Sequence, residues 1–508
     1  MLARVRSGAL IGIDAVLVEV EVDMALGLPY FNLVGLPEGA VRESKVRVLS
    51  AIKNAGFDLP QKRITANLAP ADIRKDGAAL DLPIALAVLT AAGLLEEKVV
   101  APYLFAGELA LDGIVKPIRG ALSLAVAARD AGLKGIVLPT ANAREAAVVR
   151  GIEIVPVGHF GALLAHLNGT SAIAAAPRTV EAPPVNETVP DFADVRGQAH
   201  VKRAVEVAAA GSHNALLIGP PGSGKTMLAK RLPGILPAMS FTESLETTKI
   251  YSVMGLLGEG RALVTERPFR APHHTISDAG LIGGGQIPRP GEVSLSHNGV
   301  LFLDELPEFK RNVLEVLRQP LEDGQVTLSR AALSLTYPAR SMLVAAMNPC
   351  PCGHLGDAQH TCACPLPAVQ RYRARVSGPL LDRIDIHVEV PAVKFRELAS
   401  PQDGERSSAI RERVNAARAR QRQRFRKHAD IHCNAQMTSR LIRKFCAVGA
   451  QGERMLAAVV DRLGMSARAY DRILRLARTI ADLAGADAVA AEHLAEAIQY
   501  RTLDRKLS

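Results

Sequence analysis

The sequence contains no tryptophan, and aromatic residues make up only 4% of its 508 positions. Proteins that bind single-stranded nucleic acid without sequence preference stack the bases on aromatic side chains. We therefore do not expect an aromatic binding platform in this chain. Cysteine is also scarce, with six residues in the whole sequence. Small secreted scaffolds are far richer in cysteine, so a disulfide framework is excluded.

Long apolar runs are missing as well. The longest, Leu82–Leu95, contains Pro83 and is shorter than the roughly 20 residues that a membrane-spanning helix needs. Residues 1–6 lack the apolar core of a signal peptide. We therefore expect a cytoplasmic protein that has no membrane partner.

What the sequence does have is an excess of positive charge. Lysine and arginine outnumber aspartate and glutamate by 61 to 51, which gives a net charge of +10 and a pI near 9.4. Such a balance favours a polyanionic partner. The length predicts two to four domains. Residues 170–190 are rich in alanine and proline without periodicity, which is typical of an interdomain linker.

A complete phosphate-binding loop lies near the middle of the chain. Its residues are Gly219, Pro220, Pro221, Gly222, Ser223, Gly224, Lys225 and Thr226. An apolar strand pattern precedes the loop and a helical pattern follows it, as this motif requires. Glycines let backbone N–H groups face phosphate oxygens, Lys225 supplies a positive charge, and the Thr226 hydroxyl is a ligand for Mg²⁺. The motif predicts binding of a nucleoside triphosphate.

A second motif predicts hydrolysis of that nucleotide. Residues 299–303 form an apolar strand pattern, and Asp304 and Glu305 follow at its carboxyl end. Ligands bind at this edge of open α/β sheets. Asp304 is placed to hold Mg²⁺, and Glu305 is the candidate base that orients the attacking water.

These motifs resemble the AAA+ ATPases of the magnesium-chelatase and MCM-helicase branch. Residues 267–274, 291–305 and 377–385 are similar to segments of the ComM/YifB family of magnesium chelatase-like proteins. The resemblance implies an α/β fold with an AAA+ αβα P-loop core over 191–393. It also implies an S5-type, Lon-protease-like α+β domain over 1–168, a linker over 169–190 and a C-terminal helical lid over 394–508.

The resemblance assigns roles to three further residues. Asn348 matches the sensor 1 residue that contacts the γ-phosphate or its water, and Arg468 matches sensor 2 in the lid. Arg383 matches the arginine finger, which reaches the ATP of a neighbouring subunit. A finger that acts on a neighbour requires an oligomer, and the family implies a homo-hexamer.

Two insertions of this branch point to DNA. A glycine-rich stretch over 255–297, with Arg267 and Arg270, resembles the helix-2 insert that projects into the ring channel. Residues 325–336 read as two short strands around a turn, with Arg330 at or near the tip, and match the pre-sensor hairpin. Six such arginines around a channel would form a basic ring that faces phosphates.

The N-terminal domain is expected to lack protease activity. Where the Lon proteases have their nucleophilic serine, this chain has Ala79, and Leu122 occupies the position of the partner lysine. Alanine has no atom that attacks a carbonyl group. The domain is therefore expected to serve as a scaffold or to contact DNA.

Four of the six cysteines are clustered between sensor 1 and the finger. Cys350, Cys352, Cys362 and Cys364 form a C-x-C-x₉-C-x-C pattern, and four thiolates are sufficient for a tetrahedral zinc site. The alternative interpretation is a loop with four reduced structural thiols, because C-x-C is shorter than the usual spacing. His354 and His360 are alternative ligands in the same loop.

The motifs and the resemblance together lead to one main hypothesis. We expect an ATPase that uses ATP and Mg²⁺, with Zn²⁺ as a candidate third cofactor. Its function would be that of a hexameric branch-migration helicase on branched or single-stranded DNA, in homologous recombination and natural transformation. Two alternatives remain: a metallochelatase-type motor subunit, and an AAA+ protein remodeller or regulator that does not act on DNA.

Overall fold

The structure is a computed structural model that describes most of residues 2–501. Outside the described part lie residues 1, 38, 76, 179–189, 259, 286–287, 331–332, 358–359, 394–403, 429–430, 464–466 and 502–508. Half of the expected linker, residues 179–189, therefore lies outside it. The chain forms two compact units. The first comprises Met1–Pro184 and Phe241–Thr265, and the second comprises Val185–Ser240 and Glu266–Ser508.

The first unit is built on a seven-stranded mixed sheet with the order β3-β4-β2-β1-β5-β8-β9. Strands β1, β2 and β4 are antiparallel neighbours, whereas β5, β8 and β9 run parallel to β1. The strands are β1 (Leu2–Ile11), β2 (Asp14–Ala25), β3 (Tyr30–Val34), β4 (Arg63–Ala69), β5 (Tyr103–Phe105), β8 (Gly135–Pro139) and β9 (Glu153–Val157). A separate pair consists of β6 (Glu108–Leu109) and β7 (Val115–Lys116).

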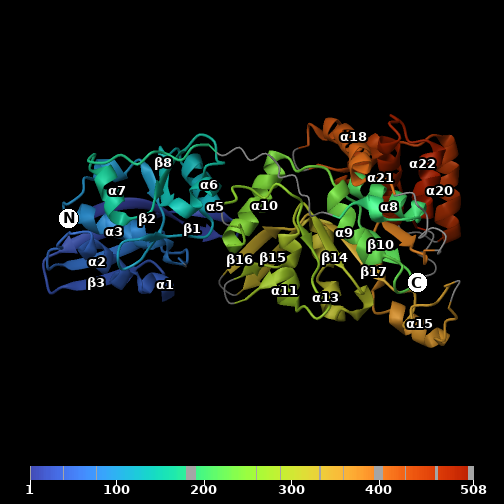
Figure 1. Ribbon diagram of the computed structural model, residues 1–508, viewed down its shortest axis with the longest axis horizontal. Coiled ribbons are helices and arrows are strands. Elements are labelled where there is room, and N and C mark those ends of the chain that lie inside the picture. Colours follow the sequence, from blue (N-terminus) through green and yellow to red (C-terminus); the bar gives the residue numbers. More distant parts are fainter. Residues whose placement is uncertain are drawn as a thin grey trace. The chain divides into compact units, whose positions relative to one another are not determined.

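Helix α3 (Asp81–Ala91) is the central helix of this unit, and it packs against β1 and β2 (Figure 1). Every residue of α3 is buried, as its almost uninterrupted apolar sequence predicts. The other helices are α1 (Gly39–Arg42), α2 (Ser44–Asn54), α4 (Glu97–Val100), α5 (Ala121–Asp130), α6 (Ala143–Ala146) and α7 (Phe160–Leu167).

A segment far along the chain completes the first unit. Helix α10 (Phe241–Met254) packs on α5, and Ala262 and Leu263 enter the apolar core around that helix. The Ser252 hydroxyl donates to the buried Glu145 carboxylate. The sequence places residues 241–265 within the expected ATPase core of 191–393, whereas the structure packs them with the N-terminal residues.

The second unit contains a five-stranded parallel sheet with the order β11-β14-β17-β10-β18. Read from the β18 edge and counted along the chain, this order is 5-1-4-3-2. Strands β10, β14 and β17 are buried throughout, because helices cover both faces of such sheets. The strands are β10 (Ala215–Ile218), β11 (Phe269–Arg270), β14 (Val300–Leu303), β17 (Met342–Met347) and β18 (Ile386–Glu389).

Short helices and two hairpins surround this sheet. Strands β15 (Gln325–Arg330) and β16 (Leu333–Pro338) pair antiparallel, which matches the expected hairpin, and β12 (Gly283–Gly284) pairs with β13 (Arg289–Pro290). The helices are α8 (Ala199–Gly211), α9 (Lys225–Ile235), α11 (Asp278–Ile282), α12 (Glu292–Leu295), α13 (Arg311–Glu315), α14 (Arg318–Asp323), α15 (Leu366–Arg373) and α16 (Gly378–Leu381).

The C-terminal part is helical and shares one apolar core with the sheet. Helix α18 packs against α8, α9 and α21 (Figure 1). The helices are α18 (Ser407–Phe425), α19 (Ser439–Phe445), α20 (Ala450–Leu463), α21 (Ala467–Leu483) and α22 (Ala491–Gln499). None of the described helices combines the length and the apolar character that crossing a membrane requires.

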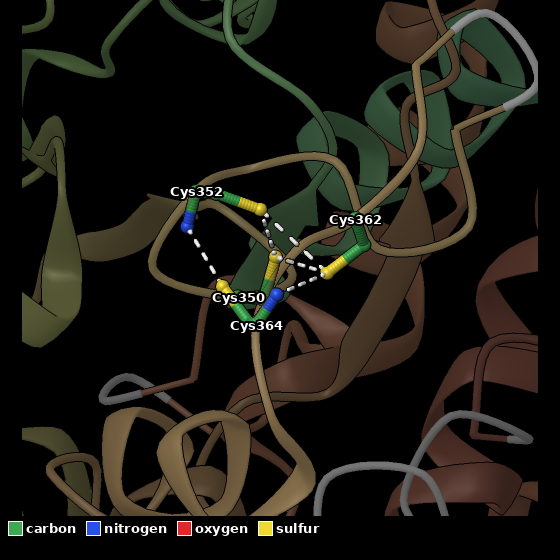
Figure 2. A group of neighbouring side chains, drawn as sticks. All are labelled: Cys350, Cys352, Cys362 and Cys364. Atoms are coloured by element: carbon green, nitrogen blue, oxygen red, sulfur yellow. Dashed lines mark hydrogen bonds between the residues drawn. The ribbon is translucent and has the colours of Figure 1, made fainter.

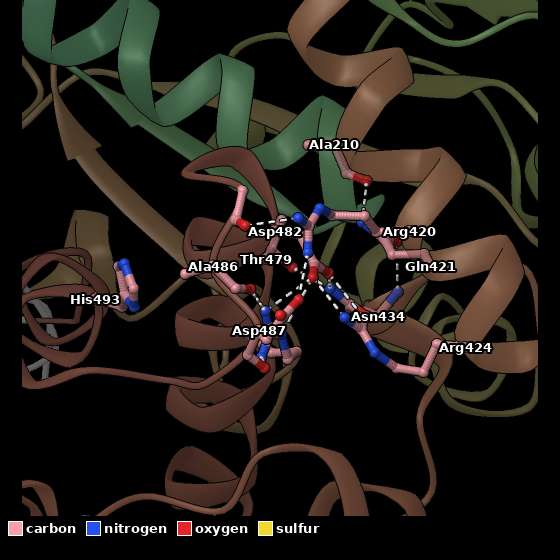
Figure 3. Close-up of polar contacts among 12 residues, drawn as sticks. Ala210, Arg420, Gln421, Arg424, Asn434, Thr479, Asp482, Ala486, Asp487 and His493 are labelled. Carbon is pink, nitrogen blue, oxygen red and sulfur yellow. Dashed lines mark hydrogen bonds and ion pairs between the residues drawn. The ribbon is translucent and has the colours of Figure 1, made fainter.

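A buried polar network ties these helices together around Asp482 of α21 (Figure 3). The Asp482 carboxylate accepts hydrogen bonds from Arg424 of α18 at 2.8 Å, from Asn434 at 2.8 Å and from Arg478 at 3.0 Å. A buried carboxylate is tolerated only when it is paired and hydrogen-bonded in this way. The expected α/β fold class is confirmed, because the second unit combines a parallel sheet with a C-terminal helical region.

Candidate functional site

The phosphate-binding loop connects the buried strand β10 to helix α9. Gly222 and Gly224 have φ angles of 75° and 90°, a region that residues with a side chain rarely adopt. Gly219 is required for a different reason, because a Cβ there would lie 2.1 Å from the carbonyl oxygen of Val390. The glycines of the motif are thus explained by the backbone path.

Lys225 is the first residue of α9 and is buried. Its ammonium group donates to the carbonyl oxygens of Gly219 and Pro220, both at 2.8 Å, and to Oδ1 of Asn348 at 3.2 Å. Burial lowers the pKa of Lys225, and the negative charges of Asp304 and Glu305 offset part of this shift. The ammonium group of Lys225 is therefore held against the phosphate-binding loop, next to Asn348, the expected sensor 1 residue.

The two expected Mg²⁺ ligands are in direct contact. Thr226 follows Lys225 in α9, and its hydroxyl donates to Oδ2 of Asp304 at 2.6 Å. Asp304 follows β14, Asn348 follows β17, and the phosphate-binding loop follows β10. These three strands are neighbours in a parallel sheet, so their carboxyl ends converge at one edge. A hydroxyl and a carboxylate form an oxygen set that suits Mg²⁺.

Glu305 has a special backbone conformation and an exposed side chain. Its φ angle is 52°, and its carboxylate lies 3.5 Å from Nδ1 of His274. The rings of His274 and His273 are tilted by 33° with 4.1 Å between their centroids, and His274 forms a T-shaped pair with Phe309. Sequence reasoning missed His274. The signal that could have found it was a pair of histidines shortly after β11, at the same edge of the sheet as Asp304 and Glu305.

The expected arginine finger, Arg383, and the expected sensor 2 residue, Arg468, both contact the carboxylate of Glu322. Sequence reasoning also missed Glu322. The guanidinium group of Arg383 pairs with Glu322 of α14 and donates to the carbonyl oxygen of Pro379 at 2.8 Å. Arg468 of α21 donates to the other oxygen of Glu322 at 3.1 Å. The hydrogen bond from Arg383 holds the pKa of Glu322 below its usual range. Arg383 is buried, whereas Arg468 is exposed.

The three arginines expected to contact DNA lie in different settings. Arg267 donates to the carbonyl oxygens of Pro237 and Asn298, both at 2.6 Å. Arg270 forms two hydrogen bonds to the Glu292 carboxylate, at 2.6 and 2.7 Å. Both are therefore engaged by the protein itself. Arg330 is the last residue of β15, at the turn of the hairpin.

The remaining expected residues fall in two places. Cys350, Cys352, Cys362 and Cys364 come together in the loop between β17 and α15. Ala79 lies in a short 3₁₀ helix of the first unit, and Leu122 lies buried in α5. Neither side chain carries a nucleophile or an amine.

Three family models match the chain. Residues 191–398 match the family described as magnesium chelatase, subunit ChlI. Residues 20–142 match the description subunit ChlI of Mg-chelatase, and residues 404–501 match magnesium chelatase, subunit ChlI C-terminal. This AAA+ family implies the use of ATP and Mg²⁺.

Individual relatives cover the whole chain. The protein named "Uncharacterized protein YifB" of Salmonella typhimurium is 44% identical over 507 residues, which is 100% of this chain and 98% of the relative. "Competence protein ComM" of Haemophilus influenzae is 44% identical over 511 residues, with the same coverage. The magnesium-chelatase 38 kDa subunit of Rhodobacter capsulatus is 25% identical over 177 residues, 31% of this chain and 50% of that protein. The chain therefore belongs to the ComM/YifB family of magnesium chelatase-like AAA+ proteins.

Proposed function

We propose that this protein is an ATP-driven motor on DNA, a homo-hexameric ring that catalyses branch migration in homologous recombination and natural transformation. One observation carries the proposal. A nucleotide site in which Lys225 contacts Asn348 and Thr226 contacts Asp304 occurs in a chain that is 44% identical, over its full length, to a competence protein. Competence is the uptake of DNA by cells, so the energy of ATP would be used on DNA.

The residues at the sheet edge would divide the work of ATP hydrolysis. Lys225 would leave the loop carbonyls and bind the β- and γ-phosphates, while Thr226 and Asp304 would hold Mg²⁺. When bound, the metal neutralises charge on the phosphates. Glu305 is the carboxylate outside the Mg²⁺ pair, and it would orient the attacking water. Asn348, already in contact with Lys225, would sense the γ-phosphate.

The arginine pair supports assembly into a ring. Arg383 and Arg468 share Glu322, so a change in the position of one guanidinium group alters the charge around the other. A finger supplied by a neighbouring subunit stabilises the charge of the transition state. For this, Arg383 would exchange Glu322 for the phosphates of the next subunit. The activity would then depend on a closed oligomer.

The DNA contact is assigned to the β15–β16 hairpin. Arg330 ends β15 and is paired in register with Leu333, so it lies beside the turn. Repeated around a ring, this position would present a circle of positive charge to the phosphates. Arg267 and Arg270 are bound to carbonyl oxygens and to Glu292, so they would contact DNA only after they exchange these partners for phosphates. The first unit would act as a scaffold without protease activity, since Ala79 and Leu122 cannot perform that chemistry.

A chelatase motor subunit is the second candidate. The names of the matched families favour it, because all three refer to a magnesium chelatase subunit. The chelatase subunit of Rhodobacter capsulatus, however, aligns with only 31% of this chain. We therefore rank this function below the DNA motor.

The rate of ATP hydrolysis with different DNA molecules separates the two candidates. Four-way junction DNA should raise the rate more than linear duplex of the same sequence and length. The stimulation should fall with salt, because phosphate contacts release counterions. Lys225→Ala serves as the inactive control for contaminating ATPases. A rate that no DNA changes at low salt would contradict the DNA motor and leave the two functions that do not act on DNA, the chelatase motor subunit and the protein remodeller.

A further inference from the structure

The four clustered cysteines form a compact group of thiols in the second unit (Figure 2). They lie in the loop that leaves the sensor strand β17 and enters α15. The Sγ atom of Cys350 is 3.4 Å from that of Cys352 and 3.7 Å from that of Cys362, and Cys352 and Cys362 are 3.6 Å apart. The Sγ atom of Cys364 lies within 4.8 Å of the other three.

These separations match one coordination geometry. Sulfur ligands at about 2.3 Å from a tetrahedral zinc ion are about 3.8 Å from one another. Disulfide-bonded sulfurs, at about 2.05 Å, are much closer. All four cysteines are free thiols. The spacing thus fits a group of thiolates around one metal ion and does not fit a pair of disulfides.

The backbone of the loop supports thiolate ligands. The N–H group of Cys352 donates to Sγ of Cys364, and the N–H group of Cys364 donates to Sγ of Cys362, both at 3.4 Å. Such N–H···S bonds stabilise negative charge on sulfur, as the outer shell of a metal site does. The bond from Cys352 to Cys364 also connects the first C-x-C pair to the second.

A second group in the same loop is a weaker candidate for the metal. His354 and His360 both contact the Asp357 carboxylate, at 3.3 and 3.0 Å. This group offers three ligands, and His360 is exposed. The thiol group offers four ligands, one of which, Cys350, is fully buried. Soft thiolate ligands select zinc over the hard cations that a carboxylate attracts.

The position of the loop shows what such a metal would hold in place. Cys350 comes two residues after Asn348, the residue that contacts Lys225. Gly353 lies against the phosphate-binding loop, because a Cβ there would be 2.4 Å from Cδ of Pro221. On the other side, Arg373 of α15 donates to the carbonyl oxygen of Pro349 at 3.1 Å. The thiol group therefore lies between the nucleotide site and α15.

We propose that Cys350, Cys352, Cys362 and Cys364 bind one structural Zn²⁺ ion, which fixes the loop after Asn348 against the phosphate-binding loop. Zinc binding does not depend on the proposed motor function. Its effect on ATP turnover does rest on that function. Loss of the ion would leave Asn348 and Pro221 less constrained, because metal binding and folding of such a loop are coupled.

Metal analysis of the full chain, purified without added zinc, tests the site. We expect about one zinc ion per chain. The double variant Cys350→Ser/Cys352→Ser should retain less than about a tenth of it. Cys433→Ser is the matched control, since Cys433 is a buried thiol outside the group. His360→Ala should also keep its zinc. Zinc that is lost in His360→Ala and kept in the double variant would overturn the thiol assignment.

Two measurements on the wild-type chain test the proposal even if the double variant does not fold. Displacement of zinc by a mercurial reagent should release the ion from the wild-type protein. Substitution with Co²⁺ should give the intense absorption bands of a tetrahedral thiolate site. A wild-type chain that contains no zinc and takes up no Co²⁺ would overturn the proposal, whatever its ATPase activity. Bound zinc with unchanged ATP turnover after its removal would overturn only the coupling to the nucleotide site.

Discussion

Variants of single residues in the candidate nucleotide site should separate binding of ATP from its hydrolysis. Lys225 is buried and contacts the backbone of the candidate phosphate-binding loop, whereas Glu305 is exposed and contacts His274. Lys225→Ala should abolish ATP binding, because its charge is removed from the phosphate site. Glu305→Gln should keep the binding and lower kcat by about 10²–10⁴-fold, because only the group that orients the water changes.

Equilibrium binding of a fluorescent ATP analogue and steady-state hydrolysis check this pair of variants. Comparison with Glu308→Gln, a nearby glutamate that pairs with Arg375, controls for the loss of a neighbouring charge. Normal turnover by Glu305→Gln would remove this residue from the catalytic role.

Glu145 predicts a pH dependence of stability in the first unit. Burial raises the pKa of Glu145, although the Ser252 hydroxyl and the N–H group of Leu122 act in the opposite direction. A carboxyl group with a raised pKa binds more protons in the folded state than in the unfolded state. Its contribution to stability therefore falls as the pH rises from the ordinary glutamate pKa toward the raised value.

A variant of Glu145 that cannot ionise should not show this loss of stability with rising pH. Glu145→Gln keeps an oxygen acceptor for the N–H group of Leu122 and cannot ionise. The Tm of wild type relative to Glu145→Gln should decrease as the pH rises above the ordinary glutamate pKa of about 4.3. The exposed Glu97→Gln in the same unit is the control. Parallel Tm curves for wild type and Glu145→Gln would show that Glu145 carries no such penalty.

Among the elements, the β15–β16 hairpin carries a prediction about DNA. Arg330 lies beside its turn, whereas the nucleotide site described above is built from other elements. Arg330→Ala should spare the basal ATPase rate and weaken both stimulation by DNA and strand movement. The weakening should be similar for all sequences, because phosphate contacts carry no base information. The salt slope of binding should also decrease by about 1, since one arginine no longer neutralises a phosphate.

Salt-dependent DNA binding and a branch-migration assay provide the measurement. Lys98→Ala, which removes an exposed charge paired with Glu96, is the control for a general loss of positive charge. Unchanged branch migration and an unchanged salt slope in Arg330→Ala would show that the hairpin does not hold DNA.

The elements also show which structural features can be predicted from local sequence. The strand before the phosphate-binding loop, the buried helix α3 and the hairpin were predictable, because each has its own periodicity or motif.

Features that depend on distant partners were not predictable. The position of α10 rests on contacts such as Ser252 with Glu145, which are 107 residues apart. Arg270 is bound by Glu292, 22 residues away, so the protein itself already pairs a charge that the sequence alone suggests for DNA. Likewise, no local pattern connects Glu322 with Arg383 and Arg468.

At the scale of the whole molecule, one apolar core of the second unit connects the C-terminal helices to the sheet. A single apolar core extends from the sheet strands to α22. Asp385, next to β18, is buried beside Arg472 of α21 and His213. Arg472 and His213 hold the pKa of Asp385 below its usual range despite burial. Arg383, the expected arginine finger, precedes Asp385 by two residues. A movement of α21 that shifts Arg472 and Asp385 would therefore also shift the backbone next to Arg383.

The last prediction concerns action between subunits. Within one chain Arg383 is bound to Glu322, and we expect it to take part in catalysis by reaching the nucleotide of a neighbouring subunit. Arg383→Ala should assemble into rings and lose at least about 10³-fold in kcat. Mixing it with Lys225→Ala should restore part of the activity. In a random one-to-one mixture, roughly a quarter of the interfaces combine an intact nucleotide site with an intact arginine.

Steady-state hydrolysis by the mixture, with mixed rings verified by native mass spectrometry, provides the measurement. Unmixed rings of each variant are the controls, and mixed rings as inactive as these would contradict action between subunits.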